Sequence, residues 1–164
     1  MTTTHDKLRD DFRPERITTL FVGESPPTGG TFFYLANSIL FRSMHEAFSK
    51  PAEFLLEFQN MGFFLDDLVL HPIDKQERKE RERSRLEAIP HLAARLIAHS
   101  PAAVVAIMRA IEPCVSEAMR QAGLVHVPLY VTAFPGRYHR RTFLAEMSEI
   151  VPKLPVAPSY QSDV

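Results

Sequence analysis

Short hydrophobic runs alternate along the chain with longer segments whose apolar residues recur every three or four positions. The short runs are rich in β-branched and aromatic residues, which is typical of strands buried in a parallel sheet. They cover residues 17–22, 63–70, 102–108 and 129–132. The helical spacing covers residues 37–48, 51–61, 112–122 and 142–151. This alternation predicts a three-layer α/β/α fold with a central, mostly parallel, four-stranded sheet.

The ends of the chain set the limits of the predicted domain. Polar residues dominate positions 1–16, and several prolines interrupt the sequence from residue 152 onwards. No internal repeat and no shift in composition requires a second domain. We therefore expect a polar N-terminal extension over residues 1–16, one α/β domain over residues 17–154, and a flexible tail over residues 155–164.

The composition fits one globular domain, because the 164 residues are 45% hydrophobic and 24% charged. A formal net charge of −1 excludes a strongly basic protein that wraps nucleic acid, although it permits a local cationic groove. The single Cys114 excludes an internal disulfide, and residues 1–16 lack the apolar core of a signal peptide. Because no run is long and apolar enough to cross a bilayer, we expect a cytoplasmic protein with no membrane partner. The sequence does not indicate the oligomeric state.

A glycine-rich turn that carries a carboxylate, GESPPTGG at residues 23–30, follows the first predicted strand. It should place Glu24 at the carboxyl end of a parallel strand, where α/β folds form their ligand crevices. Gly29 and Gly30 permit close approach of the backbone to a ligand. A carboxylate at this position can orient or deprotonate water. The alternative is that Glu24 caps the following helix or complements its dipole.

The last predicted strand opens into a second loop, AFPGRYHRRTF at residues 133–143, which holds one His and three Arg. Guanidinium groups bind phosphate through paired N–H donors and stay charged. Arg137, Arg140 and Arg141 are therefore candidates for holding an anion such as a phosphate backbone. The alternative is a solvated basic turn before a helix. Since both loops follow strands of one sheet, we expect them to share one pocket.

Several segments together resemble the uracil-DNA glycosylase superfamily. They are the strand followed by GESPP, the aromatic cluster Phe32, Phe33 and Tyr34, residues 63–72, the strand PAAVVAI, and the loop FPGRYHRRTF. The resemblance runs from about residue 17 to residue 154 and rests on order and spacing. It implies a DNA glycosylase that hydrolyses the N-glycosidic bond of a damaged or deaminated base, with DNA as partner and no cofactor.

The resemblance also implies roles for individual residues. The family places the group that handles the attacking water in its first motif, and Glu24 occupies that position. A carboxylate there also stabilises the positive charge that develops on the sugar. Phe33 is expected to stack on a flipped base, and Gly23 and Ser25 to border the substrate. A member of three adjacent aromatic residues can equally be a core residue.

Two positions depart from the family pattern. Asp67, with Asp66 before it, lies where the family commonly has an Asn, and we expect it to contact the edge of the base. An ionised Asp only accepts hydrogen bonds, which argues against plain uracil recognition; alternatively, the side chain bonds backbone N–H groups of a nearby turn. The family's His-Pro-Ser signature appears as Phe-Pro-Gly at residues 134–136. His139 is the candidate replacement for the missing histidine, which stabilises the departing base.

Other signals are weaker. Residues 75–87 pair opposite charges at helical spacing, which predicts a solvent-facing helix and not a site. The three expected pairs are Glu77 with Arg81, Arg78 with Glu82, and Arg83 with Glu87. The seven His residues lack zinc-helix spacing, and one Cys excludes a four-cysteine iron–sulfur cluster, so no metal is expected. The turn at residues 23–30 has neither the Lys of a P-loop nor a GxGxxG pattern. Two other functions stay open: a non-catalytic module that binds a nucleotide or nucleic acid, and an enzyme acting on a small phosphorylated or nucleoside substrate.

Overall fold

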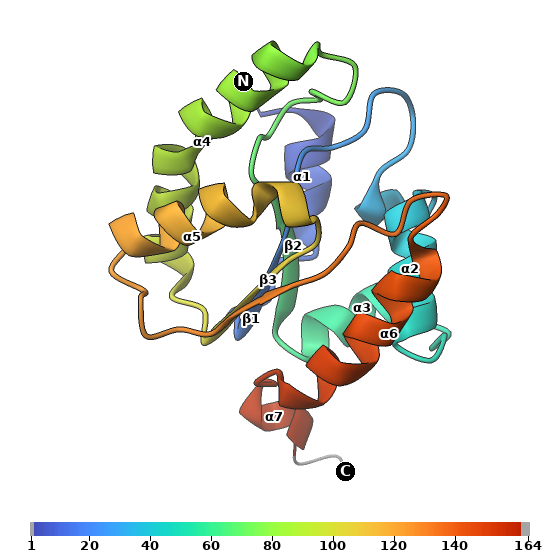
Figure 1. Ribbon diagram of the computed structural model, residues 1–164. Coiled ribbons are helices and arrows are strands. Elements are labelled where there is room, and N and C mark those ends of the chain that lie inside the picture. Colours follow the sequence, from blue (N-terminus) through green and yellow to red (C-terminus); the bar gives the residue numbers. More distant parts are fainter. Residues whose placement is uncertain (1, 162–164) are drawn as a thin grey trace.

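The sheet at the centre of the molecule has four parallel strands in the order β2-β1-β3-β4 (Figure 1). The computed structural model describes residues 2–161. The strands are β1 Thr19–Gly23, β2 Phe63–Asp67, β3 Ala103–Ala106 and β4 Leu129–Val131. In register, Thr19 of β1 lies between Phe63 of β2 and Ala103 of β3. The predicted α/β class and the four parallel strands are thereby confirmed.

Helices cover both faces of the sheet and complete the three layers. Figure 1 shows α4 and α5 on one face and α2, α3 and α6 on the other. The α-helices are α1 Thr4–Asp11, α2 Ile39–Ala47, α3 Phe54–Asn60, α4 Arg78–His99, α5 Glu112–Gln121, α6 Arg140–Ile150 and α7 Pro158–Gln161. The 3-10 helices are η1 Phe33–Leu35, η2 Arg109–Ile111 and η3 Val151–Lys153. None of the helices in residues 2–161 is long and apolar enough to span a membrane.

The order of the strands fixes where a ligand site can form. The chain passes from β1 to β2 on one side, and later returns to place β3 on the other side of β1. Connections that leave in opposite directions open a crevice at the carboxyl ends of the strands. All residues of β1 and β2 are buried. Polar groups at the ends of these two strands must therefore find hydrogen-bond partners inside the protein or face that crevice.

The charged segment predicted to be a solvent-facing helix is the first part of a much longer one. Helix α4 has 22 residues and contains Pro90. Its later turns bury Ala88, Ile89, Leu92, Ala93 and Leu96. This buried face holds α4 against the sheet, which fixes where its charged first turns project.

Both ends of the described chain are hydrogen-bonded to the rest of the protein. Near the first end, Arg9 Nη2 of α1 donates to Asp67 Oδ2 of β2 at 3.3 Å. At the other end, the Thr19 hydroxyl donates to Pro155 O at 3.1 Å, and Ala157 N donates to Met61 O at 2.8 Å. Residues 162–164 of the predicted flexible tail lie outside the described residues.

Candidate functional site

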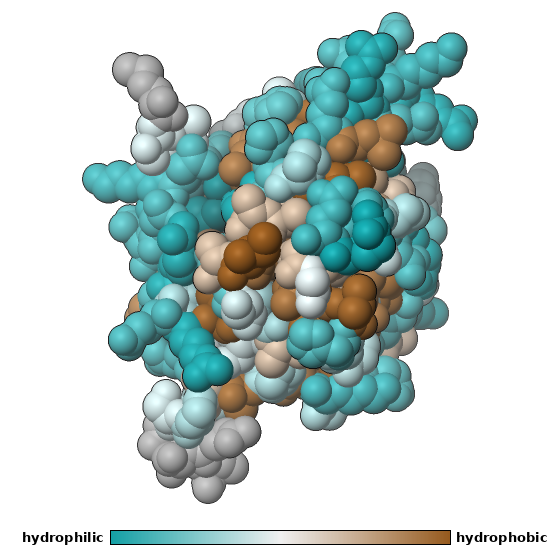
Figure 2. All heavy atoms as spheres, turned by 90° about the vertical axis from the view of Figure 1, so that its left-hand side faces the viewer, coloured by the Kyte–Doolittle hydropathy of each residue, from teal (hydrophilic) through white to brown (hydrophobic). Residues whose placement is uncertain are grey.

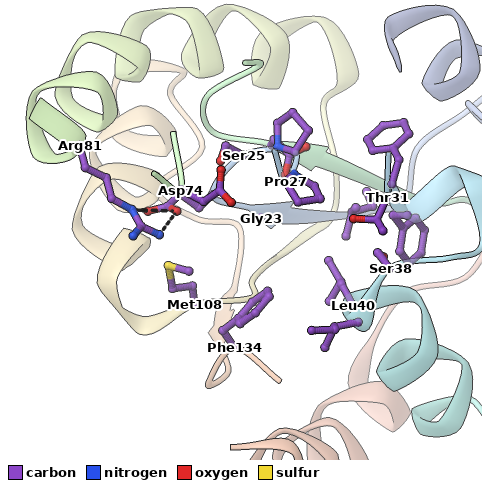
Figure 3. Close-up of a pocket in the computed structure, with 17 residues that line it drawn as sticks. Gly23, Ser25, Pro27, Thr31, Ser38, Leu40, Asp74, Arg81, Met108 and Phe134 are labelled. Atoms are coloured by element: carbon purple, nitrogen blue, oxygen red, sulfur yellow. Dashed lines mark hydrogen bonds and ion pairs between the residues drawn. The ribbon is translucent and has the colours of Figure 1, made fainter. Parts of the chain in front are cut away.

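A cavity of about 350 Å³ lies at the carboxyl ends of β1 and β2 (Figure 3). The loop after β1 and the first turns of α2 supply most of its wall. Asp67 at the end of β2, Arg81 of α4, Met108 after β3 and Phe134 after β4 complete it. Five of the residues proposed from sequence line it, and these are Gly23, Glu24, Ser25, Phe33 and Asp67.

The loop after β1 is held by the segment that follows β2. Leu68 N donates to Gly23 O at 2.8 Å, and Val69 N donates to Glu24 O at 2.9 Å. The backbone N–H and hydroxyl of Thr28 both donate to Asp74, at 3.2 and 2.6 Å. The hydrogen bond from the Thr28 side chain lowers the pKa of Asp74. These bonds keep the cavity wall in place without using the side-chain atoms of Glu24.

Two arginines of α4 bind the carboxylate of Glu24. The Nε atom of Arg81 donates to both oxygens of Glu24, at 3.1 and 3.0 Å, and its Nη2 atom also donates to Oε1. Arg85 donates to Oε2 from Nε at 2.7 Å and also from Nη2. Glu24 is only 7% exposed. Its carboxylate lies between the two guanidinium groups at the cavity wall. The hydrogen bond with Glu24 raises the pKa of Arg81 and keeps that side chain charged.

Asp67 is a buried carboxyl group packed directly on Gly23. A Cβ atom at position 23 would come within 2.7 Å of Oδ1 of Asp67, so the close approach requires glycine. Burial raises the pKa of Asp67 to about 7. The positive charge of Arg9 opposes this rise, and the negative charge of Asp66 adds to it. Arg9 of α1 approaches Oδ2 of Asp67 at 3.3 Å. Asp67 is therefore partly protonated near neutral pH, and its protonated form both donates and accepts hydrogen bonds.

Aromatic rings form the apolar part of the wall. Phe33 is 2% exposed and contacts the rings of Tyr34, Phe41, Phe54 and Phe58, with centroids 5.0 to 6.4 Å apart. It is therefore a core residue that also lines the cavity, and its proposed stacking on a base stays a prediction.

Phe32 also lines the cavity, and the ring of His5 in α1 stacks on it at 4.3 Å. Phe134 is 37% exposed and lies beside Met108, on the side of the cavity opposite Pro27 in Figure 3.

The late loop reaches the cavity through Phe134, while its basic residues lie elsewhere. Arg137, His139 and Arg140 are not among the described residues that line the cavity. Arg140 pairs with Glu46 of α2, and the guanidinium of Arg137 lies 5.8 Å from the ring of Tyr138. His139 precedes α6 and makes no side-chain capping bond. Their proposed contacts with phosphate and leaving group stay predictions.

A carboxylate of α6 fixes the start of this late loop. Glu146 Oε1 accepts a hydrogen bond from Ala133 N at 3.0 Å, and Oε2 accepts one from Arg109 Nη2 at 2.6 Å. Glu146 thereby ties η2 to the residue before Phe134. Its pKa is lowered although burial opposes the change, because the Arg109 and Ala133 hydrogen bonds favour the ionised form.

Neither protein-family models nor curated protein sequences match this chain. The resemblance described from sequence therefore stays an expectation. Within residues 2–161, no three His, Cys, Asp or Glu side chains come together as a metal site would require.

Sequence reasoning missed Arg81 and Arg85 as site residues. Of the three charge pairs expected along the helix, Arg78 with Glu82 is present at 3.3 Å. Arg81 was expected to pair with Glu77, but it pairs with Glu24, 57 residues away. A signal was present, because residues four apart share one face of a helix and two arginines at that spacing can converge on one anion.

Proposed function

We propose that the cavity binds a nucleobase and that the protein hydrolyses the N-glycosidic bond of a damaged or deaminated base in DNA. The observation that carries the proposal is the combination of aromatic walls with two carboxyl groups, Glu24 and Asp67, at the carboxyl ends of adjacent parallel strands. The volume of about 350 Å³ falls at the small end of ligand pockets, as a single planar ring with part of its sugar requires.

Glu24 supplies the chemistry in this proposal. Breaking an N-glycosidic bond develops positive charge on the sugar and requires an attacking water. A carboxylate at the cavity wall stabilises that charge and orients the water. The short loop after β1, held by Leu68 and Val69, presents Glu24 from a fixed backbone.

Asp67 contacts the edge of the base in this proposal. Because its pKa is about 7, a protonated Asp67 offers one O–H donor and one carbonyl acceptor, as an Asn side chain does through its amide. This removes the objection, raised from the sequence, that an Asp can only accept. The ionised form, dominant above pH 7, would favour a base edge that presents two donors.

Base release from oligonucleotides tests the proposal. Single- and double-stranded oligonucleotides carrying uracil, hypoxanthine, xanthine or a mismatched base are incubated with the protein, and alkali-sensitive strand cleavage is measured. We expect product with at least one base, and a loss of about 100-fold or more for Glu24→Gln, the range for removing a general base. Glu117→Gln is the matched control, because this half-buried glutamate of α5 lies outside the cavity, and the variant should keep full activity.

The outcomes separate the candidate functions. A Glu24→Gln variant as active as the parent would remove Glu24 from the reaction. Base-specific binding without product from any substrate would favour the non-catalytic nucleotide or nucleic-acid binding module. The observation that favours this second function is that Glu24 accepts hydrogen bonds on both oxygens from Arg81 and Arg85, which leaves its carboxylate little capacity for a proton or a water.

A further inference from the structure

The two arginines that bind Glu24 use only part of their hydrogen-bonding capacity. A guanidinium group has five N–H donors. The bonds to Glu24 come from the Nε and Nη2 atoms of Arg81 and Arg85. The Nη1 atoms of both groups have no hydrogen-bond partner among residues 2–161. The pair can therefore accept a second anion while Glu24 keeps both guanidinium groups in position.

Arg81 brings these free donors to the cavity. It lines the cavity wall, and its side chain is 30% exposed, against 16% for Arg85. Figure 3 shows Arg81 extending from α4 toward the cavity. Its guanidinium is hydrogen-bonded to the carboxylate of Glu24. The aromatic part of the cavity, formed by Phe32, Phe33 and Phe134, belongs to the same space. A ligand with a ring among the aromatic residues can thus reach Arg81 with another group.

The surrounding charge favours an anion despite the carboxylates at this wall. Residues 75–85 contain six basic and three acidic side chains, an excess of three positive charges in a chain whose net charge is −1. They include the first turns of α4, where the helix dipole adds a positive potential. The acidic groups nearest to Arg81 are Glu24, which it binds, and Asp74, which is held by Thr28. The local balance, with both carboxylates counted, stays positive.

We propose that Arg81, which Glu24 holds in place together with Arg85, forms a phosphate subsite of the cavity, so that the ligand is a nucleotide unit and not a free base or nucleoside. This inference rests on the proposed nucleobase pocket and assigns the group attached to the sugar. The phosphate can belong to a mononucleotide or to a DNA backbone. A guanidinium matches either, since it binds phosphate oxygens in a bidentate geometry.

Calorimetric binding of matched ligand pairs tests the subsite. The probes are 2′-deoxyuridine with its 5′-monophosphate, the corresponding deoxyinosine pair, and a short single-stranded oligonucleotide that contains deoxyuridine. For the parent protein we expect the monophosphate, the oligonucleotide or both to bind at least about tenfold more tightly than the nucleoside, the gain of one or two charge-assisted hydrogen bonds. Preference for the oligonucleotide alone would assign the phosphate to a DNA backbone.

Three variants connect this preference to Arg81. Arg81→Gln should abolish it, and Arg81→Lys should weaken it, because lysine keeps the charge but loses the bidentate geometry. Arg78→Gln is the matched control on the same helix, since Arg78 is exposed and pairs with Glu82. It should keep the full preference.

Other results would overturn the subsite. These are equal affinities for nucleoside and phosphate-bearing ligands, no binding of any of these probes, a preference that survives Arg81→Gln, or an equal loss in Arg78→Gln. The comparison of ligands on the parent protein needs no variant to fold. The subsite and the reaction can fail separately. Phosphate-dependent binding without base release would contradict only the proposed hydrolysis. Base release from DNA that Arg81→Lys leaves unchanged would contradict only the subsite.

Discussion

Asp67 shows how one residue can connect stability with the chemistry of the cavity. Its carboxyl group is buried at the end of β2, packed on Gly23 and approached by Arg9. The fold raises its pKa from an ordinary value of 3.8 to about 7. The folded protein therefore binds a proton at Asp67 over a range of pH in which the unfolded chain has released it.

This difference in proton binding predicts how stability changes with pH. The contribution of protonated Asp67 is fully present below about pH 4 and is lost as the pH rises to about 7, because only the folded state must ionise a buried group. The expected loss is on the order of a few kcal/mol. Asp67→Asn keeps the shape and removes the titration, so the free energy of unfolding in urea should fall less between pH 4.5 and pH 8 than in the parent.

The comparison with Asp67→Asn also removes the effect of other groups. Burial lowers the pKa of His99, which by itself makes stability rise with pH. The parent and Asp67→Asn share this contribution of His99, so it cancels in their comparison. The prediction would be contradicted if the parent and Asp67→Asn lost the same stability over this range.

Sequence reasoning succeeded for residues whose position depends on the local pattern. Glu24 follows a hydrophobic run after one glycine, and Asp67 interrupts another run where an ionised group would be costly inside a sheet, so the local sequence was enough to place both at the carboxyl ends of strands. The partners of Glu24 could not be predicted in this way, because Arg81 approaches it from 57 residues away. That contact depends on the phase and direction of α4, which are fixed by tertiary packing.

At the scale of elements, β2 is an edge strand whose outer side is bonded by side chains, and at Leu65 by a hydroxyl group. Leu65 N donates to the Tyr34 hydroxyl at 2.7 Å, and the same hydroxyl donates to Leu65 O at 2.8 Å. Since β1 lies on the other side of β2, this hydroxyl takes the place of a neighbouring strand. The bond also fixes η1, which carries Phe33 to the cavity.

Tyr34→Phe should therefore be costly although it removes one atom. It leaves a buried N–H and a buried C=O without a partner, for which we expect a loss of about 2 kcal/mol in the free energy of unfolding. Tyr160→Phe is the matched control, because that hydroxyl donates to Glu57 in a half-buried position and should cost less than about 1 kcal/mol. Equal effects of the two substitutions in urea unfolding would contradict this role of Tyr34.

Element prediction was accurate where hydrophobic periodicity was strong and less so where charge dominated. The predicted strand over residues 63–70 ends at Asp67, because Leu68 and Val69 bend to bond the loop after β1. The charged segment before residue 87 was expected to face solvent, but Arg81 and Arg85 in its first turns face Glu24 at the cavity wall. Charge periodicity indicates that a segment is helical without revealing which side chains turn inward.

For the whole molecule, the cavity is assembled from segments that are far apart in sequence. The loop after β1, the end of β2, the first turns of α4 and Phe134 converge at one edge of the sheet. The parallel order β2-β1-β3-β4 brings these strand ends together. Predicting the fold class therefore located the cavity, while its volume and its lining by Phe134 and not His139 depended on loop geometry.

A second surface with exposed hydrophobic side chains lies outside the cavity. Figure 2 views the side of the molecule on which α4 and α5 lie, and shows hydrophobic side chains near the middle of that face among hydrophilic ones. Leu86 and Ile97 of α4 are exposed, as is Val125 after α5. Any test of the site must therefore separate the cavity from this face.

Backbone amide NMR during titration with 2′-deoxyuridine 5′-monophosphate makes that separation and tests the central claim, that the cavity is the nucleotide site. We predict shift changes concentrated at cavity residues that retain an N–H group, chiefly Gly23, Ser25, Thr31 and Ser38, with α5 unaffected. Changes confined to α5 and the last turns of α4 around Ile97, or none at a ligand concentration that saturates binding by calorimetry, would contradict the account.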